Sequence, residues 1–340
     1  NFNIYIIMKN KTIIDQFTLL VEQIKLDIDF SSGNEQMVNM YRLSSVKKVL
    51  DILKKYPSDI KSSKQLKEIK NVGAKSLKRI DEILETGKLS ELKITKDSVH
   101  HLQIISELEK IFGIGRKKAY ELFMKFSITS IDDLKKKHKS GKITLPDNIS
   151  KGLKYVGKIN TSIPRHEITK IDDVLINVAF GLGSRVFGVT CGSYRREKSN
   201  SGDIDFILFD TSLVTENDIK KSKNNYIYEF VSKLKQQGII IDSLTGESVR
   251  TKYMGICKLS NGDLCRIDIR MIQYESYYPA ILYFTGSRDL NKKMRQIADS
   301  MGYLLNEYGL YDKNKQMVIV NSEADIFRTL GLEYLNPVNR

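Results

Sequence analysis

The stretch that decides the fold of the second half of the chain is Val189-Thr-Cys-Gly192-Ser193-Tyr-Arg-Arg196-Glu-Lys-Ser-Asn-Ser-Gly202-Asp203-Ile-Asp205. A Gly-Ser turn follows one predicted strand, and an Asp-x-Asp begins the next. Because residues i and i+2 of a strand point to the same face, Asp203 and Asp205 should project side by side. Two adjacent carboxylates repel each other unless cations lie between them, which predicts a divalent-metal site with oxygen ligands.

A third carboxylate is expected from a neighbouring strand. Arg266-Ile-Asp268-Ile-Arg270 supplies it, since the isoleucines on either side of Asp268 would face the opposite side of the sheet. Arg196 adds a guanidinium that can bind phosphate oxygens bidentately. An Asp-x-Asp alone is usually a solvated strand end, but with these partners it predicts a nucleotidyltransferase site with two Mg²⁺ ions, for which Mn²⁺ can substitute.

Hydrophobic periodicity divides the chain near residue 160. Before that point, apolar residues recur at helical spacing, as at Val46, Val49, Leu50 and Leu53 and again at Leu77, Ile80 and Leu84. After Pro164, short β-rich runs are bounded by glycines and polar turns. The predicted strands are Arg185–Cys191, Ile204–Leu208, Gly238–Leu244, Tyr253–Leu259 and Arg266–Met271, followed by a helix at Asn291–Met301 and short strands around Leu304–Tyr308 and Val318–Val320. The expected fold class is multi-domain α+β: an all-α N-terminal half, a mixed β-sheet with helices, and a small α+β C-terminal subdomain.

Length and charge agree with this division. A chain of 340 residues predicts two or three folding units. Residues 1–160 hold 31 basic and 19 acidic residues, whereas residues 161–340 hold 24 and 22. This asymmetry indicates a half that binds a polyanion, with solvated helix faces as the alternative. No apolar run is long enough to cross a bilayer, and the three cysteines and four histidines lack disulfide or zinc spacing, so a reducing compartment is expected.

Two segments of the helical half share a turn pattern. They are Leu66-Lys-Glu-Ile69-Lys-Asn-Val72-Gly73 and Leu108-Glu-Lys-Ile111-Phe-Gly113-Ile114-Gly115, and both resemble helix-hairpin-helix motifs. Their glycines would let main-chain N–H groups and the next helix's N-terminus hold a phosphate without reading bases. Asn71 replaces the first glycine in the first copy, and asparagine tolerates a left-handed turn. The candidate DNA-binding residues here are Gly73, Lys75, Gly113, Gly115 and Lys117.

Together these motifs resemble those of the family X DNA polymerases, the polymerase-beta type in particular, from about Lys11 to Pro337. Further matching stretches are Lys154-Tyr155, Ile163-Pro-Arg165, Tyr283-Phe-Thr-Gly-Ser287, Asn291-Lys-Lys-Met-Arg295 and Asn306-Glu-Tyr308. The resemblance implies a tail (1–10), a lyase-like helical DNA-binding domain (11–95), a helix-hairpin-helix duplex-binding subdomain (96–150), a catalytic palm (151–272) and a nascent-base-pair-binding subdomain (273–340). No BRCT domain is expected before them.

The resemblance also implies residue roles. Asp203 and Asp205 would bridge both Mg²⁺ ions, and Asp268 would hold the catalytic ion near the primer 3′-hydroxyl. The residues expected to bind the incoming dNTP are Ser193, Arg196, Gly202, Tyr283, Phe284, Gly286 and Asn291. Arg266 and Arg295 would contact DNA, and Arg270 would approach Asp205. Main-chain carbonyls expected to hold Na⁺ or K⁺ belong to Lys67, Ile69, Val72, Glu109, Ile111 and Ile114. Cys191 is expected to be a buried small apolar residue.

The lyase pocket departs from the family pattern. Its expected members are Arg42, Lys75, Lys78 and Arg79, and Arg79 stands at the position of the Schiff-base lysine. A guanidinium stays protonated and cannot attack an abasic-site aldehyde, so 5′-deoxyribose phosphate lyase activity is expected to be absent or much reduced. Lys75 lies one helical turn before Arg79 and is the substitute candidate, whereas Lys78 is rotated about 100° from Arg79.

The expected function is template-directed filling of short gaps in base excision repair, by a monomeric polymerase acting on gapped or nicked DNA with dNTPs and without a membrane. Its expected location is the nucleus, or the cytoplasm or virion if the chain is viral. Three alternatives stay open: a template-independent transferase, which would be expected to depart at Tyr283-Phe284, a polymerase with an active lyase that uses Lys75, and a scaffold with a decayed site. The three carboxylates and Arg196 argue against the last.

Overall fold

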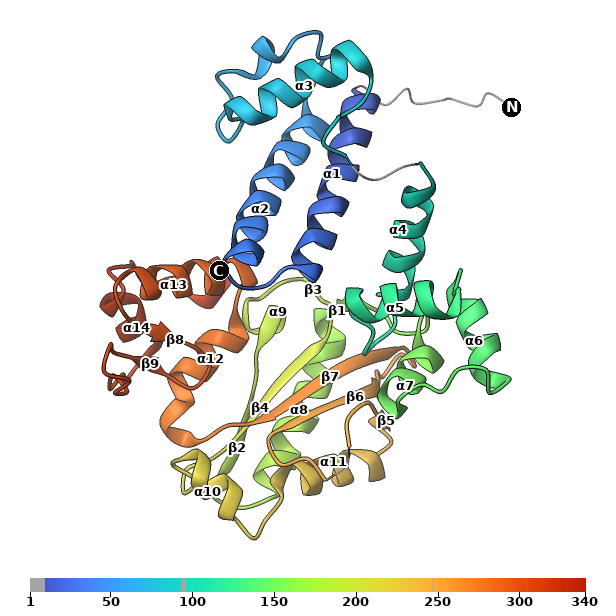
Figure 1. Cartoon of the computed structure of the whole chain (residues 1–340). Helices are drawn as coiled ribbons and strands as arrows, with labels where there is room; N and C mark the ends of the chain where they lie inside the picture. The colour runs from blue at the N-terminus through green and yellow to red at the C-terminus, as the bar shows by residue number, and fades with distance from the viewer. Residues whose placement is uncertain (1–9, 93–95, 247) are drawn as a thin grey trace. The chain divides into compact units, whose positions relative to one another are not determined.

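The computed structural model of the chain describes residues 10–92, 96–246 and 248–340 (Figure 1). Its internal contacts divide the chain into two compact units, Asn1–Ile149 and Ser150–Arg340. No helix within the described ranges is both long and apolar enough to cross a bilayer.

The first unit is helical throughout its described residues, which confirms the all-α prediction. Its elements are α1 (Lys11–Phe30), α2 (Gly33–Lys55), η1 (Ser63–Leu66), α3 (Ala74–Thr86), α4 (Lys96–Leu108), α5 (Arg116–Phe126), α6 (Ile131–Lys139) and the start of α7 (Asp147–Tyr155). The helices α1 and α2 form an antiparallel pair (Figure 1). Val46, Val49 and Leu53 are buried as predicted, but in α3 Ile83 is buried and Leu84 is 38% exposed.

Among the described residues of the second unit, five strands form one mixed sheet in the order β2-β4-β7-β6-β5. These strands are β2 (Val186–Thr190), β4 (Ile204–Asp210), β5 (Ile240–Ser243), β6 (Lys252–Lys258) and β7 (Leu264–Met271). The strands β4 and β7 are parallel, and the other neighbouring pairs are antiparallel. All five predicted strands are confirmed, with ends that differ by a few residues.

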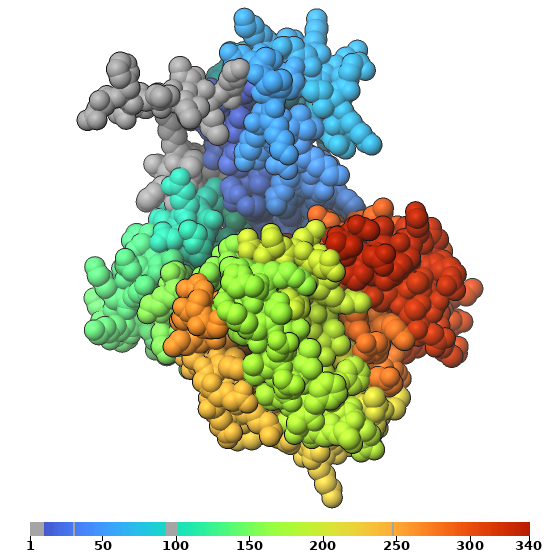
Figure 2. All heavy atoms as spheres, turned by 180° about the vertical axis from the view of Figure 1, so that it is seen from behind, coloured from blue at the N-terminus to red at the C-terminus, as the bar shows by residue number. Residues whose placement is uncertain are grey.

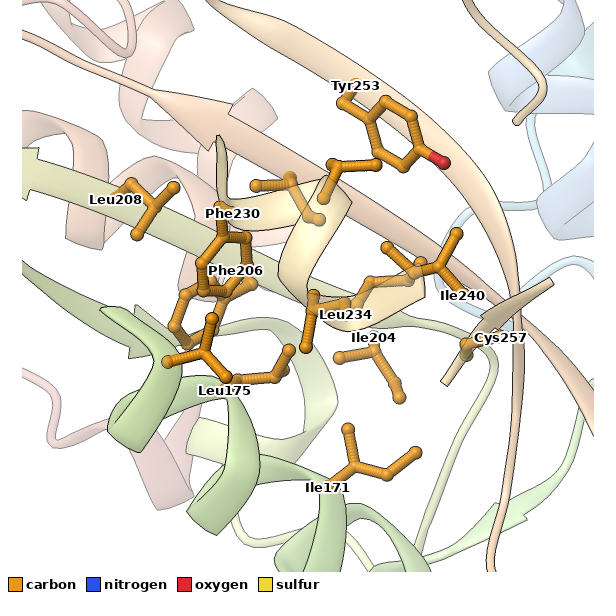
Figure 3. Packing of buried hydrophobic residues seen from close by; sticks show 14 of the residues in the cluster. Ile171, Leu175, Ile204, Phe206, Leu208, Phe230, Leu234, Ile240, Tyr253 and Cys257 are labelled. Atoms are coloured by element: carbon orange, nitrogen blue, oxygen red, sulfur yellow. The ribbon is translucent and has the colours of Figure 1, made fainter. Parts of the chain in front are cut away.

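Two helices, α8 (Arg165–Phe180) and α11 (Tyr226–Gln236), cover one face of this sheet. Every second residue of β4, namely Ile204, Phe206 and Leu208, packs into the core on that face (Figure 3). The rings of Phe206 and Phe230 stack with centroids 5.3 Å apart. Figure 2 shows the molecule from behind, where the light green region that includes α8 lies at the surface. The opposite face of β4 is therefore left for polar groups and for a second apolar cluster.

The remaining elements of the second unit are short strands and helices before, within and after the sheet region. They are β1 (Ile163–Pro164), which pairs with β3 (Asn200–Ser201), α9 (Gly192–Arg195) and α10 (Glu216–Lys221). The C-terminal elements are η2 (Tyr274–Ser276), α12 (Tyr277–Thr285), α13 (Arg288–Ser300), β8 (Leu304–Leu305), β9 (Leu310–Tyr311), α14 (Glu323–Thr329) and η3 (Pro337–Asn339). The predicted helix at Asn291–Met301 is confirmed and begins three residues earlier, at Arg288.

The prediction of a strand at Val318–Val320 is wrong, and the predicted strand at Leu304–Tyr308 is much shorter. Near the first, the Val318 N–H donates to the Leu310 carbonyl at 2.7 Å, but no ladder continues through the described residues. Val318 and Val320 pack against the C-terminal core while Ile319 is 87% exposed. An isolated antiparallel bridge joins Met317 to Tyr311 of β9, but no strand extends through Val318–Val320, where the alternation reflects packing on one side.

Gly188 offers a test of the sheet packing. A Cβ at this position would lie 2.1 Å from the Phe206 ring, so Gly188→Ala should push Phe206 away from Phe230. We expect a loss of about 1–3 kcal/mol in the free energy of unfolding, measured by urea denaturation. Gly183→Ala is the matched control, because its Cβ would meet only Val186 at 3.6 Å. Equal stability of the two variants would contradict this packing.

Candidate active site

Parallel pairing of β4 with β7 brings the three predicted carboxylates together. Asp205 and Asp268 are register partners on these adjacent strands. Asp203 comes directly before β4, and its negative charge acts on both Asp205 and Asp268. Along β7 the burial alternates, with Ile267 and Ile269 fully buried on the helix-covered side. The expectation that a neighbouring strand supplies the third carboxylate is confirmed by this register.

The carboxylates lie in a charge environment that favours a cation. Burial first, and then the negative charges of Asp203 and Asp268, raise the pKa of Asp205 to about 7. Burial also raises the pKa of Asp268. Its Oδ1 atom is buried without a hydrogen-bond partner in the structure. Divalent cations with a preference for oxygen ligands, such as Mg²⁺, fit this donor set.

Arg266, on β7 with Asp268, contacts two of the carboxylates. Its Nη2 hydrogen-bonds to Oδ2 of Asp203, and its Nε lies 3.7 Å from Oδ1 of Asp268. As the described side chains stand, no group of three or more His, Cys, Asp or Glu residues is arranged to enclose a metal ion. A metal bound between these carboxylates would compete with Arg266 for Asp203.

The Gly-Ser turn is held against Asp205 by the backbone. Cys191 donates its N–H to the Asp205 carbonyl at 2.8 Å, and Gly192 follows with φ of +57°. A Cβ on Gly192 would lie 2.3 Å from Oδ2 of Asp205. Glycine is thus required here both by backbone conformation and by space. Cys191 is 1% exposed, as expected, and burial raises the pKa of its thiol to about 12.

The short helix α9 places Ser193 and Arg196 side by side. Nη2 of Arg196 donates to Oγ of Ser193 at 3.0 Å, and Nη1 donates to the Thr285 carbonyl. The Nε of Arg196 is buried without a partner in the structure. Gly202 precedes Asp203 directly, and a Cβ there would meet only the Thr161 carbonyl, at 3.8 Å. Gly202 is thus next to Asp203 in the chain, and the Asp205 charge acts on Arg196.

A buried ion pair that the sequence did not point to joins α9 to the C-terminal elements. Arg195 donates from Nη2 to Oε2 of Glu323 at 2.8 Å and from Nη1 to Oγ1 of Thr285 at 2.7 Å. Arg340 donates to Oε1 of Glu323 at 2.7 Å, and its side chain is fully buried. Although burial alone would raise it, the hydrogen bonds and charges of both arginines hold the pKa of Glu323 below its usual value. Glu323 lies in an ordinary helix start, so no local pattern distinguishes it.

The helices α12 and α13 carry the other residues predicted to bind nucleotide or template. Nδ2 of Asn291 donates to the Tyr283 carbonyl at 2.6 Å, and the Arg295 guanidinium lies 5.8 Å from the centre of the Tyr283 ring. These three residues line one hollow with Leu305 and Asn306. The guanidinium of Arg270 lies 5.4 Å from the Phe284 ring centre. Burial raises the pKa of Asp205, and the Arg270 charge only partly opposes that rise. Gly286 has φ of +75° and would meet Nη1 of Arg196 at 3.1 Å if it carried a Cβ.

In the first unit, the two predicted hairpins have the same backbone form. Asn71 has φ of +75° and Gly113 has φ of +86°, which confirms Asn71 as the left-handed residue of the first copy. Gly73 and Gly115 then cap the following helices in extended conformations. Space is open around the Cα atoms of both capping glycines. The carbonyls of Ile69 and Ile111 accept from the residues three positions on, at 3.1 and 3.0 Å.

The predicted lyase pocket contains an ion pair around Glu91. Arg79 donates to both Glu91 oxygens, at 3.0 Å for Nη2, and Arg42 donates to Oε2 at 2.9 Å. Burial would raise the pKa of Glu91, but the two guanidiniums hold it below its usual value. Lys75 and Lys78 on α3 are both exposed. Glu91 was not predicted from the sequence, because it lies in a turn without a recognisable motif.

A palm-type sheet with three carboxylates and a Gly-Ser turn defines the nucleotidyltransferase class. Models for the DNA polymerase beta palm and the DNA polymerase beta thumb match residues 162–274 and 280–340, and a helix-hairpin-helix model matches residues 8–89. The chain belongs to family X of the DNA polymerases.

Relatives of known name support this assignment. The chain is 30% identical to DNA polymerase lambda of Rattus norvegicus, over 93% of this chain and 55% of the relative. It is 29% identical to DNA polymerase lambda of Arabidopsis thaliana, over 90% and 60%. It is 24% identical to the DNA nucleotidylexotransferase of Xenopus laevis, over 97% and 68%. The chain thus spans little more than half the length of the two polymerases.

Substitution of Gly192 tests whether the turn positions Asp205. We expect Gly192→Ala to displace the Asp205 carboxylate and to weaken Mn²⁺ binding about tenfold or more, measured by electron paramagnetic resonance of the free ion. Gly181→Ala is the control, since its Cβ would make only ordinary contacts at 3.5 Å. Unchanged Mn²⁺ affinity in Gly192→Ala would count against the turn as a support for the site.

Proposed function

We propose that this chain is a template-directed DNA polymerase that fills short gaps during DNA repair. The observation that carries the proposal is the parallel register of Asp205 with Asp268, with Asp203 directly before β4 and Arg196 beside Ser193. Its substrates would be dNTPs and gapped or nicked duplex DNA. Family membership and the polymerase lambda relatives support the class of reaction.

In this proposal Asp203 and Asp205 would hold two divalent ions, Mg²⁺ or Mn²⁺, and Asp268 would hold the one near the primer 3′-hydroxyl. Such ions stabilise charge on the attacking and leaving oxygens of a phosphoryl transfer. The protein's own contribution is to place the charged groups. Arg196 and Ser193 would bind the terminal phosphates of the dNTP, and Arg196 is already oriented by the Thr285 carbonyl. Tyr283 and Asn291 would border the new base pair, with Arg295 on the template side.

The DNA would be held mainly by the first unit. Its two hairpins present free space around Gly73 and Gly115, each followed by a helix N-terminus. Such N-termini bind phosphates through main-chain N–H groups without reading sequence. Na⁺ or K⁺ at the hairpin carbonyls would assist this contact. The basic surplus of residues 1–160 supports the same assignment.

Primer extension on gapped DNA tests the catalytic assignment. We expect Asp268→Asn to lower dNTP incorporation about 100-fold or more, because it removes charge from the metal site, while affinity for gapped DNA stays unchanged. Asp299→Asn, an exposed change on α13, is the matched control. Substantial activity of Asp268→Asn would overturn the two-metal assignment. Efficient extension without a template would instead favour a transferase, the activity named for the Xenopus relative.

We further propose that the helical domain of residues 11–95, called the first domain below, tethers the downstream end of a gap and lacks lyase activity. The support is that Arg79, at the nucleophile position, is a guanidinium held on both sides of the Glu91 carboxylate. Arg42 holds the same carboxylate. A permanently charged side chain in an ion pair cannot form a Schiff base with an abasic-site aldehyde.

Borohydride trapping on DNA with a 5′-deoxyribose phosphate decides this point. We expect the wild type to give little trapped complex, because Arg79 offers no free amine, and we expect Arg79→Lys combined with Glu91→Gln to give more. Efficient trapping by the wild type would contradict the proposal. Its loss in Lys75→Ala, with retention in the control Lys78→Ala, would then identify Lys75 as the nucleophile.

A further inference from the structure

Arg116 differs from its neighbours in the second hairpin. It is the first residue of α5 and follows Gly115 directly, at the helix N-terminus assigned above to a DNA phosphate. Lys117, the next residue, is exposed, as expected for a side chain that binds DNA. The Arg116 side chain is only 9% exposed. A basic residue at a phosphate-binding turn is therefore already covered by protein.

Three carboxylates surround the Arg116 guanidinium. Nη2 donates to Oε2 of Glu22 at 3.0 Å, Nη1 donates to Oε2 of Glu109 at 3.3 Å, and Nε lies 3.3 Å from Oδ2 of Asp29. Glu109 belongs to the hairpin itself. Glu22 and Asp29 lie about two turns apart on α1, hence on one side of that helix. The N-terminal helix thus places an acidic face on the second hairpin.

The charges in this cluster do not balance. Against the three carboxylates stand Arg116 and Lys25, which pairs with Glu22. Burial raises the pKa of Asp29, although the Arg116 charge partly opposes this. Nε of Arg116 and Oδ2 of Asp29 are both buried without a well-formed hydrogen bond. The contact is attractive through charge but incompletely satisfied, so it can be exchanged for a better anion.

We propose that the carboxylates of α1 occupy Arg116 in place of a DNA phosphate and hold the first domain against the second hairpin until duplex DNA displaces them. This inference rests on the proposed function, in which that hairpin binds the DNA backbone. A phosphate at Gly115 and Lys117 would be repelled by Glu22 and Asp29. The phosphate and these two carboxylates therefore cannot occupy the hairpin together. Arg116 binds phosphate oxygens at least as well as carboxylates, and release of counterions from the DNA adds to the exchange.

The test compares DNA affinity in two pairs of charge variants. Fluorescence anisotropy with a labelled gapped duplex at low salt would measure Kd for the wild type and for Glu22→Gln/Asp29→Asn. We expect the variant to bind about fivefold more tightly, because Arg116 is released from competition. Asp15→Asn/Glu35→Gln removes the same charge from exposed positions of α1 and α2 and should change Kd much less. Small-angle scattering without DNA should show a larger radius of gyration for the first variant alone.

A second comparison separates release of Arg116 from a general effect of charge. In an Arg116→Gln background, Glu22→Gln/Asp29→Asn should no longer tighten binding beyond the exposed control pair. Persistence of the gain there, an equal gain in the control, or an unchanged radius of gyration would each overturn the proposal. If the double variant fails to fold, Glu22→Gln alone should show the same direction. Failure of the wild type to bind any duplex would refute the proposed function and the competition between DNA and the α1 carboxylates. The radius of gyration would still report the contact of α1 with Arg116.

Discussion

The parallel pairing of β4 with β7 is the interaction on which the rest of the second unit depends. It sets Asp205 opposite Asp268 and leaves the alternate residues of both strands, such as Phe206 and Ile267, in the core beneath α8 and α11. A shift of one residue would bury the carboxylates and expose the isoleucines. The same apolar packing that stabilises the sheet therefore fixes which face carries the charged groups.

Around this sheet, close contacts between backbone and side chains position the charged groups. Gly192 lets the turn lie against Asp205, and Arg196 and Arg195 both reach Thr285, through its carbonyl and its hydroxyl. The Arg195–Glu323 pair then joins α9, next to the Gly-Ser turn, to α14. Removing one partner of such a buried pair would leave a charge without compensation. The buried Arg195–Glu323 ion pair and the hydrogen bonds to Thr285 thus connect the site to the C-terminal elements.

The first unit combines two hairpins that we propose to bind DNA with arginines that carboxylates engage. Its hairpins repeat one backbone turn, with Asn71 and Gly113 in the left-handed conformation. Two of its arginines are engaged by carboxylates: Arg79 by Glu91, and Arg116 by the acidic face of α1. Because guanidiniums remain charged at any working pH, protons act on these pairs only through the carboxylates, whereas competing anions and salt act on the guanidiniums as well.

The sequence by itself determined the two halves, the five strands and the three carboxylates, because period-2 alternation and the Asp-x-Asp spacing are local signals. It also indicated Asn71 as the left-handed residue, whereas the absence of a nucleophile at Arg79 stays a prediction. It misjudged Val318–Val320, since pairing with β9 stops at an isolated bridge of Met317 and the alternation beyond it comes from packing on one side. Only the tertiary structure brought Glu91, Glu323, Glu22 and Asp29 to their arginines. Those partners lie from about a dozen to more than a hundred residues apart, and no spacing rule connects side chains that meet only when the helices pack.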